Sequence, residues 1–291
     1  MANRDHIRNP VEWSVDQLKT AGHALGQTGH ALTRHDEAPS APLPAVRRIE
    51  VTELKDVLAK GVADFGACRT DVIFLCVIYP LVGLVLALFL FNYDFVPLLF
   101  PLASGFALLG PLAAVGLYEM SRRREQGAEV NWGDAFGVLA TPAFGAIVVL
   151  GLILLGIFLL WLVTAYTIYH MTMGHEGVAS LGAFYRDVLT TSGGGYLIVA
   201  GIGVGFLFAV VVLVISVVSF PMLLDRDVGL YTAVATSIRV CLVNPLPMAV
   251  WGLIVAGGLA LGSLPLLVGL IVVMPVLGHA TWHLYRKVVP R

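Results

Sequence analysis

The chain of 291 residues is 58% hydrophobic and 13% charged, with a mean hydropathy of +0.85. A soluble protein carries about 25% charged residues, so this composition excludes an ordinary soluble fold and predicts an integral membrane protein. The net charge of −1 leaves no basic face for nucleic acid, and we expect no nucleic-acid partner.

The first 50 residues are polar throughout and show no signal peptide, so insertion must depend on an internal apolar segment that starts near Val72. The three cysteines, Cys68, Cys76 and Cys241, form no CxxC motif and are odd in number. We therefore expect them to be small apolar side chains without a disulfide framework.

Residues 1–46 are predicted to form a polar, partly disordered cytoplasmic tail and linker, of which 36–46 is rich in proline. A thin apolar stripe follows Pro10: Val11, Val15, Leu18, Leu25 and Leu32. Gly22 and Gly29 weaken this stripe, since glycine costs about 1 kcal/mol per helical site relative to alanine. Two interpretations stay open, a partner- or membrane-binding helix and a marginal tail, and we favour the tail. Residues 52–67 then predict an amphipathic helix leading to the bilayer.

The remaining chain, 47–291, is predicted to be one all-α, polytopic transmembrane domain. Its apolar runs predict six transmembrane helices: about 72–91, 95–118, 143–168, 196–220, 247–262 and 264–284. The connections 92–94 and 262–264 are very short. We therefore expect tight hairpins there, and three helical hairpins overall.

The orientation follows from the cationic side chains, of which Leu117–Glu125 (LYEMSRRRE) is the densest group. With these six spans, seventeen of the 18 lysines and arginines fall on one side, against Arg186 alone on the other. The positive-inside rule then places both termini in the cytoplasm of a bacterial cytoplasmic membrane.

The fifth span is the shortest, because Pro245 and Pro247 leave about 16 residues before Ser263, or roughly 24 Å of helix. The hydrocarbon core is nearer ~30 Å. The span could tilt little, thin the bilayer, or extend backwards through 231–243, which is otherwise an interfacial helix. A re-entrant hairpin is the competing interpretation, but it would place the C-terminal basic residues on the wrong side.

A faint internal repeat has one proline in the second span of each pair, at Pro111, Pro221 and Pro275. Three hairpins around a pseudo-threefold axis would produce it. Proline is also common in membrane helices, where neighbouring groups satisfy the freed carbonyl, so both explanations stay open.

No Asp, Glu, Lys or Arg lies in the middle of a predicted span, and this argues against an ion-coupled transporter. His279 and His283 lie four residues apart on one face of the sixth span, a spacing at which two imidazoles can share a metal or one can bind haem. His170 and His175 lie on the other side of the membrane and cannot complete that site. An interfacial band with Trp282 is the favoured interpretation, and we expect no cofactor and no metal.

Charged residues beside the second and fourth spans predict an ion-pair network on the inner face. The candidates are Glu119, Arg122, Arg123, Arg124, Asp225, Arg226 and Asp227. In this hypothesis Asp225–Asp227 neutralise the three arginines, while the alternative is independent solvation or contact with lipid headgroups.

Two GxxxG pairs, Gly201 with Gly205 and Gly258 with Gly262, predict helix–helix packing. The chain has no nucleophile with a base, no paired carboxylates and no phosphate-binding loop, so we predict no catalytic residues.

Three segments, LLGPLAAVGLYEMSRRRE, VVSFPMLLDRDVG and MPVLGHATWHLYRK, together resemble a bacterial family of predicted integral membrane proteins classed as a domain of unknown function. Some members of that family carry the label "putative cytochrome c oxidase subunit I". The likeness covers about residues 45–289. It implies a six-span inner-membrane protein and carries over no activity and no site residues.

The oxidase label does not fit this chain as a catalytic subunit. The catalytic subunit of a haem–copper oxidase has twelve spans and six metal- and haem-binding histidines within the membrane. Here six spans are predicted, and the four histidines outside the tail lie at span ends on opposite faces.

We therefore predict a non-catalytic assembly, scaffolding or accessory factor. The alternatives are a small-solute channel or transporter, and a haem- or metal-binding accessory component of a respiratory complex. The expected partners are membrane lipids and, under the accessory hypotheses, other membrane proteins such as a respiratory complex.

Overall fold

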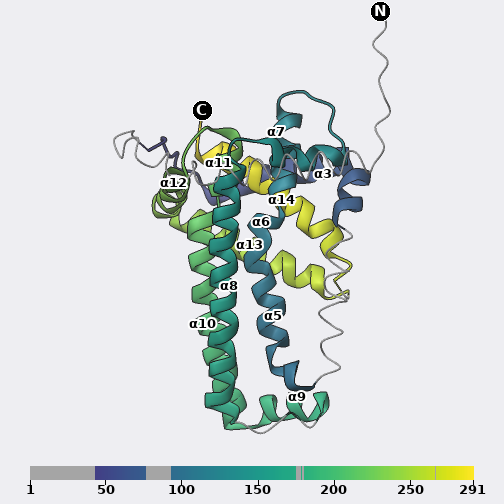
Figure 1. Cartoon of the computed structure of the whole chain (residues 1–291), viewed down its shortest axis with the longest axis vertical. Helices are drawn as coiled ribbons and strands as arrows, with labels where there is room; N and C mark the ends of the chain where they lie inside the picture. Colours follow the sequence, from purple (N-terminus) through teal and green to yellow (C-terminus); the bar gives the residue numbers. More distant parts are fainter. Residues whose placement is uncertain (1–42, 77–92, 175–177, 179, 266) are drawn as a thin grey trace, which may run out of the picture.

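The computed structural model describes residues 43–76, 93–174, 178, 180–265 and 267–291, and all regular structure in these residues is helical (Figure 1). Most of the predicted tail, 1–46, and most of the first predicted span, 72–91, lie outside the described residues. The elements in chain order are η2 Val51–Glu53, α3 Leu54–Cys76, η4 Tyr93–Leu98, α5 Leu99–Phe106, η5 Ala107–Leu109, α6 Gly110–Ala113, α7 Val115–Glu125, η6 Trp132–Ala140, α8 Phe144–Met173, α9 Leu181–Thr190, α10 Ser192–Ser216, α11 Ser219–Asp225, α12 Leu230–Val243, α13 Pro245–Ser263 and α14 Leu270–Val288.

Four helical stretches are long and apolar enough to cross a membrane: Val96–Glu125, Phe144–Met173, Ser192–Asp225 and Pro245–Ser263. They correspond to the second, third, fourth and fifth predicted spans. The sixth predicted span is helical from Leu270 rather than from 264, and its polar second half keeps it outside this group.

The long axis of the molecule is set by α8 and α10, which lie side by side, with α5, α6 and α7 stacked as a third column (Figure 1). Helices α13 and α14 are inclined to these columns. The ends of α3, α7, α11, α12 and α14 gather at one end of the molecule together with the C-terminus, and α9 lies across the other end (Figure 1).

The fifth predicted span is a separate helix of 19 residues, which corresponds to about 28 Å. It begins at Pro245, where proline needs no backbone donor. It does not extend back through α12, because Asn244 between the two helices is non-helical. Asn244 is held there by the N-terminal segment: Ile49 N donates to its Oδ1 at 2.8 Å, and its Nδ2 donates to Arg47 O at 3.1 Å.

The three prolines of the suspected repeat have different structural roles. Pro111 lies in the first turn of α6, and Pro221 lies in the first turn of α11, just after the break at Val218. In these positions the missing N–H interrupts no helical hydrogen bond. Pro275 lies inside α14.

The core is concentrated where α14 packs against α3 and α7. A Cβ added at Gly61 of α3 would lie 2.6 Å from Ala280 Cβ, and one added at Gly278 would lie 2.6 Å from Leu117 Cδ1. Side chains on every side of α14 are buried, including Trp282, Leu284 and Tyr285 at 0% exposure. Helix α14 is therefore enclosed by neighbours at this end of the molecule.

The predicted packing glycines are in part at helix contacts. Gly258 and Gly262 of α13 face Val273 and other α14 side chains, and Gly205 of α10 faces Trp161 of α8. A Cβ added at Gly201 would have no atom of a neighbouring element within 4 Å among the described residues.

Candidate functional site

Polar side chains of four helices meet around the C-terminal half of α14. We call this group the α14 junction. Its members are Asp64 from α3, Ser121, Arg124 and Glu125 from α7, Asp225 from α11, and His279, Trp282, His283, Tyr285 and Arg286 from α14. The α14 members recur at helical spacing, so one broad face of this helix contacts the three helices α3, α7 and α11.

Asp64 is the central acceptor of one half of the α14 junction. Its Oδ2 lies 2.7 Å from Ser121 Oγ and 2.8 Å from His283 Nε2, while its Oδ1 accepts from Arg124 Nη1 at 2.7 Å. The residue is 7% exposed. A carboxylate with these donors satisfies the rule that a buried charge must be paired and hydrogen-bonded.

These contacts shift the pKa of the Asp64 carboxyl group. Burial by itself raises the pKa of the carboxyl group, but the hydrogen bonds from His283 and Ser121 and the positive charge near them outweigh burial. The pKa of Asp64 is therefore lower than its ordinary value, and the group is ionised at neutral pH.

The atoms that carry protons in this cluster can be deduced from the atoms that accept hydrogen bonds. Ser121 donates its one hydroxyl proton to Asp64, so His279 Nδ1, 2.7 Å from Ser121 Oγ, must donate to the hydroxyl. A neutral His279 then carries a bare lone pair on Nε2. Among the described residues, this is the one buried side-chain nitrogen or oxygen without a hydrogen-bond partner.

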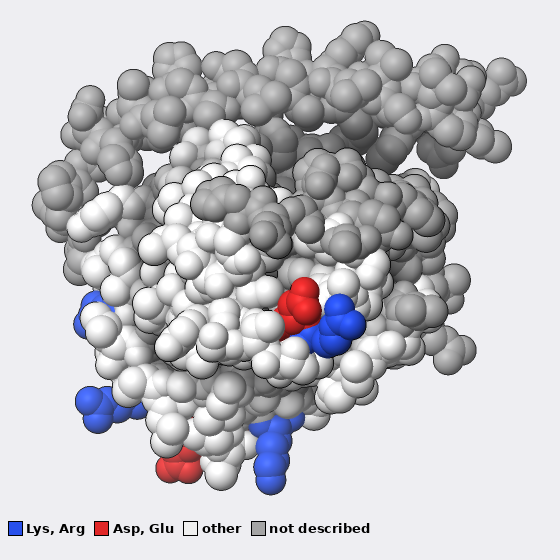
Figure 2. Space-filling model, turned by 90° about the horizontal axis from the view of Figure 1, so that it is seen from below, with Lys and Arg blue, Asp and Glu red and all other residues white. Residues whose placement is uncertain are grey.

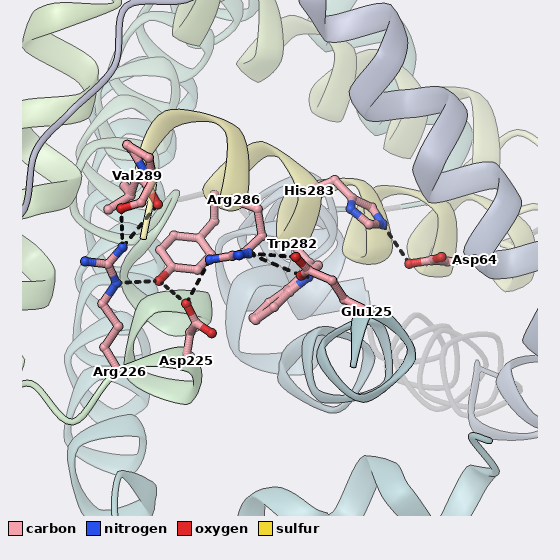
Figure 3. Close-up of polar contacts among 10 residues, drawn as sticks. Asp64, Glu125, Asp225, Arg226, Trp282, His283, Arg286 and Val289 are labelled. Carbon is pink, nitrogen blue, oxygen red and sulfur yellow. Dashed lines mark hydrogen bonds and ion pairs between the residues drawn. The ribbon is translucent and has the colours of Figure 1, made fainter. Parts of the chain in front are cut away.

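The second half of the α14 junction is centred on Arg286 (Figure 3). Arg286 Nε lies 3.1 Å from Glu125 Oε1, and its Nη1 lies 3.2 Å from Asp225 Oδ2. Trp282 Nε1 donates to Glu125 at 2.9 Å, and Tyr285 Oη donates to Asp225 at 2.8 Å. One guanidinium of α14 thus links the end of α7 to the end of α11.

Arg226 fixes the C-terminus beside this centre (Figure 3). Its Nε donates to Tyr285 Oη at 3.1 Å, and its Nη2 donates to the carbonyl oxygens of Val289 and Pro290 at 3.2 and 2.6 Å. Asp227 is exposed, and no ion pair of Asp227 is found in the part of the chain that the structure describes.

The three consecutive arginines are paired with acids close to them. Glu119, at 0% exposure, accepts from Arg122 Nε and Arg123 Nε at 2.7 Å each. Arg123 also pairs with Asp134, and Arg124 pairs with Asp64. The predicted direct pairs between these arginines and Asp225–Asp227 are replaced by nearer partners, because Glu119 lies one helical turn away.

Some of these residues were therefore predicted from sequence, and the residues that connect them were missed. Glu119, Arg122, Arg123, Arg124, Asp225 and Arg226 are in polar contacts, and His279 and His283 meet at Asp64. Asp64, Ser121, Glu125 and Arg286 were missed. The spacing of Trp282, His283 and Arg286 at 3, 4 and 7 residues from His279 was a signal that could have indicated one polar face including Arg286.

The chemistry of the α14 junction is that of paired, mostly part-buried charges. In a nucleophilic triad the histidine lies between the acid and the serine, whereas here Ser121, at 1% exposure, lies between Asp64 and His279. No group of three or more His, Cys, Asp and Glu suited to a metal ion is found among the described residues. This arrangement favours a structural role.

Comparison with known proteins agrees with a membrane protein of unknown activity. Residues 99–225 match the model of a family described as "Predicted integral membrane protein (DUF2189)". The match contains the first of the three segments on which the resemblance was based, and it ends within the second. No curated protein and no solved structure gives a significant match.

Proposed function

We propose, starting from the match of residues 99–225 to a predicted integral membrane family, that this chain is a non-catalytic accessory factor of the bacterial cytoplasmic membrane. It crosses the bilayer six times, has both termini in the cytoplasm, and packs against another integral membrane protein through the exposed side of α10.

The two ends of the molecule support this orientation. Arg122, Arg123, Arg124, Arg226 and Arg286 all belong to the end that holds the α14 junction. The opposite end, on which α9 lies, is viewed in Figure 2 and presents few charged side chains among its described residues. Positively charged segments are retained on the cytoplasmic side, so the α14 junction is cytoplasmic.

The polar groups support a non-catalytic role. Helices α8, α10 and α13 contain no Asp, Glu, Lys or Arg, and the charged residues of the α14 junction are paired with one another. Groups engaged in this way hold helices together, and α8, α10 and α13 contain no carboxylate, lysine or arginine that could move an ion.

The observation that carries the proposal is the exposure of α10. In the apolar part of Ser192–Asp225, only 6% of the residues are buried by other parts of the chain. Bulky side chains such as Val199 and Phe206 are exposed beside Gly201 and Gly203, which have open space above them. Small residues next to large ones allow a second helix to approach closely in a membrane.

Site-specific photo-crosslinking in native membranes tests the proposal. A benzophenone amino acid at Val199 should yield a discrete adduct with one integral membrane protein, identified by mass spectrometry. The same group at Leu154, which is fully buried, should yield no intermolecular adduct. Lipid adducts alone at Val199, in membranes that hold the native complement of proteins, would contradict the accessory role.

Haem or metal binding is a second candidate, and one observation favours it: His279 Nε2 is buried and has no hydrogen-bond partner among the described residues. His283 does not assist, because its Nε2 is bound to Asp64. A visible absorption spectrum of the protein purified from native membranes tests it. A Soret band that is lost in His279→Gln would support haem, whereas a spectrum without visible bands would rule haem out.

A further inference from the structure

Helix α12 is the one described apolar helix of 10–17 residues, too short to cross the bilayer, and it lies at the end that holds the α14 junction. It follows α11 and directly precedes α13, and Figure 1 shows it nearly end-on, across the direction of α8 and α10. Because α13 is a candidate span that starts at Pro245, α12 ends at the level where that span enters the membrane.

The inner face of α12 is small and hydroxylic. Ala233, Thr236, Ser237 and Val240, spaced 3, 1 and 3 residues apart, are all at 0% exposure. Ser237 Oγ donates to Val214 O of α10 at 2.7 Å, and Ser219 Oγ of α11 donates to Ala233 O at 3.2 Å. These contacts fix which side of α12 faces the protein.

The outer face of α12 is apolar and large. Tyr231, Ile238 and Leu242 are 64%, 37% and 75% exposed, and Leu246 at the start of α13 continues this surface at 65%. A helix on a water-exposed surface has the opposite arrangement, with polar residues outward and apolar residues inward. The outward apolar face therefore requires an apolar surrounding at this level.

One cation lies on this outer face. Arg239 is exposed, and no ion pair or hydrogen bond of its guanidinium is found among the described residues. The arginines nearby differ: Arg124, Arg226 and Arg286 all have partners within the protein. A guanidinium beside exposed Leu242 fits the boundary between phosphate groups and acyl chains.

We propose that α12 is an interfacial helix that binds a phospholipid of the surrounding leaflet, with the headgroup phosphate on Arg239 and an acyl chain along Leu242 and Leu246. Charge complementarity and continuity with the exposed surface of α13 carry the assignment. A planar guanidinium binds phosphate oxygens in a bidentate manner. The proposal rests on placement of the chain in a membrane, and it is independent of the accessory role and of the partner of α10.

Spin labelling in lipid vesicles distinguishes lipid from the other possible occupants. A nitroxide at Leu242→Cys is placed in full-length protein whose three native cysteines are replaced by alanine, in vesicles of phosphatidylethanolamine and phosphatidylglycerol. The label should collide more with oxygen than with a water-soluble nickel complex. A matched label at Asp227→Cys, exposed at the same end, should show the reverse. Preference for nickel at position 242 would show water there, and exclusion of both would show a protein surface such as a second copy; either result overturns the proposal.

The phosphate contact is tested on the same full-length chain. Addition of phosphatidylglycerol to protein in neutral detergent should raise the melting temperature of the wild type, and Arg239→Gln should lose at least half of that rise. Arg239→Lys should retain part of it, because it keeps the cation but loses the bidentate geometry of the guanidinium. Arg186→Gln at the opposite end should behave as the wild type. An equal rise in Arg239→Gln and the wild type would overturn the assignment of the phosphate to Arg239.

Discussion

The two ends of this membrane protein differ in how they hold charge. At the α14 junction, acids from α3, α7 and α11 are bound by arginines, a histidine and a tyrosine at 2.7–3.2 Å, and Asp64 and Tyr285 among them are buried. At the α9 end, Arg186 and Asp187 are 70% and 50% exposed and 3.7 Å apart. Helix α9 contributes no buried residue at all.

This difference follows from the burial of each end. Removing a charge from water costs several kcal/mol, so charges at the α14 junction must be paired and the pairs tie helices together. An exposed pair such as Arg186–Asp187 is solvated and contributes little. The helix termini at one end are therefore cross-linked by polar contacts, whereas the ion pair at the other end joins two residues of the same helix.

The largest expected effect comes from Glu119→Ala. It would leave Arg122 and Arg123 side by side without their shared carboxylate, and breaking a buried pair costs up to about 3–5 kcal/mol, which partial exposure of both arginines and the remaining Asp134 partner of Arg123 reduce. Thermal unfolding in detergent should show a large fall in the melting temperature. Glu129→Ala, at an exposed position nearby, should leave it unchanged; equal effects of the two changes would refute the paired arrangement.

A smaller loss of stability is expected from a substitution that crowds the close contact of α3 and α14. In Gly61→Ala the new methyl group meets Ala280 and the backbone of Val276, and overpacking of this kind costs about 1–3 kcal/mol. Gly66→Ala is the matched control, because its position on α3 is open. There, alanine should stabilise the helix by about 1 kcal/mol. The two melting temperatures should move in opposite directions, and a common direction would place the contact elsewhere.

Acid should weaken the α14 junction before the other end. The pKa of Asp64 is lower in the folded protein than in the unfolded chain, where it is about 3.9. Its contribution to stability is then fully present above that value and is lost as the pH falls through the lower folded pKa. Melting temperatures between pH 3 and pH 6 should fall less in Asp64→Asn than in the wild type. Parallel curves would show that Asp64 does not gain from its ionised state.

The smallest effect is expected at the α9 end. Arg186→Ala removes a loose and exposed ion pair, which is worth about 0–1 kcal/mol. The melting temperature should stay within experimental error of the wild type. A loss as large as that of Glu119→Ala would show that the two ends are held by charge to the same extent.

Much of the arrangement along the membrane could be predicted from sequence. The apolar runs predicted the second to fifth candidate spans with ends that differ by at most seven residues, because long uncharged segments have few other structures open to them. The break at Pro245 was also visible, since proline marks the first turn of a helix. The second predicted span is not one regular helix. The stretch Val96–Glu125 is made up of the short elements η4, α5, η5, α6 and α7.

The partners at the α14 junction could not be predicted in the same way. Asp64 lies in an amphipathic helix whose sequence does not show which neighbour it meets, and Arg286 was one of several basic residues near the C-terminus. Contacts such as His283 with Asp64 span 219 positions, so they depend on how the helices pack. Local spacing predicted the shared face of α14, and tertiary packing decided its partners.

Topology reporters test the orientation of the two ends most directly. Fluorescent protein fused after Arg291 should be bright, and alkaline phosphatase at the same position should be inactive, because the proposed orientation places that end in the cytoplasm. Phosphatase fused after Gly174, at the α9 end, should be active. An active phosphatase after Arg291 together with an inactive one after Gly174 would contradict the placement of the α14 junction on the cytoplasmic side.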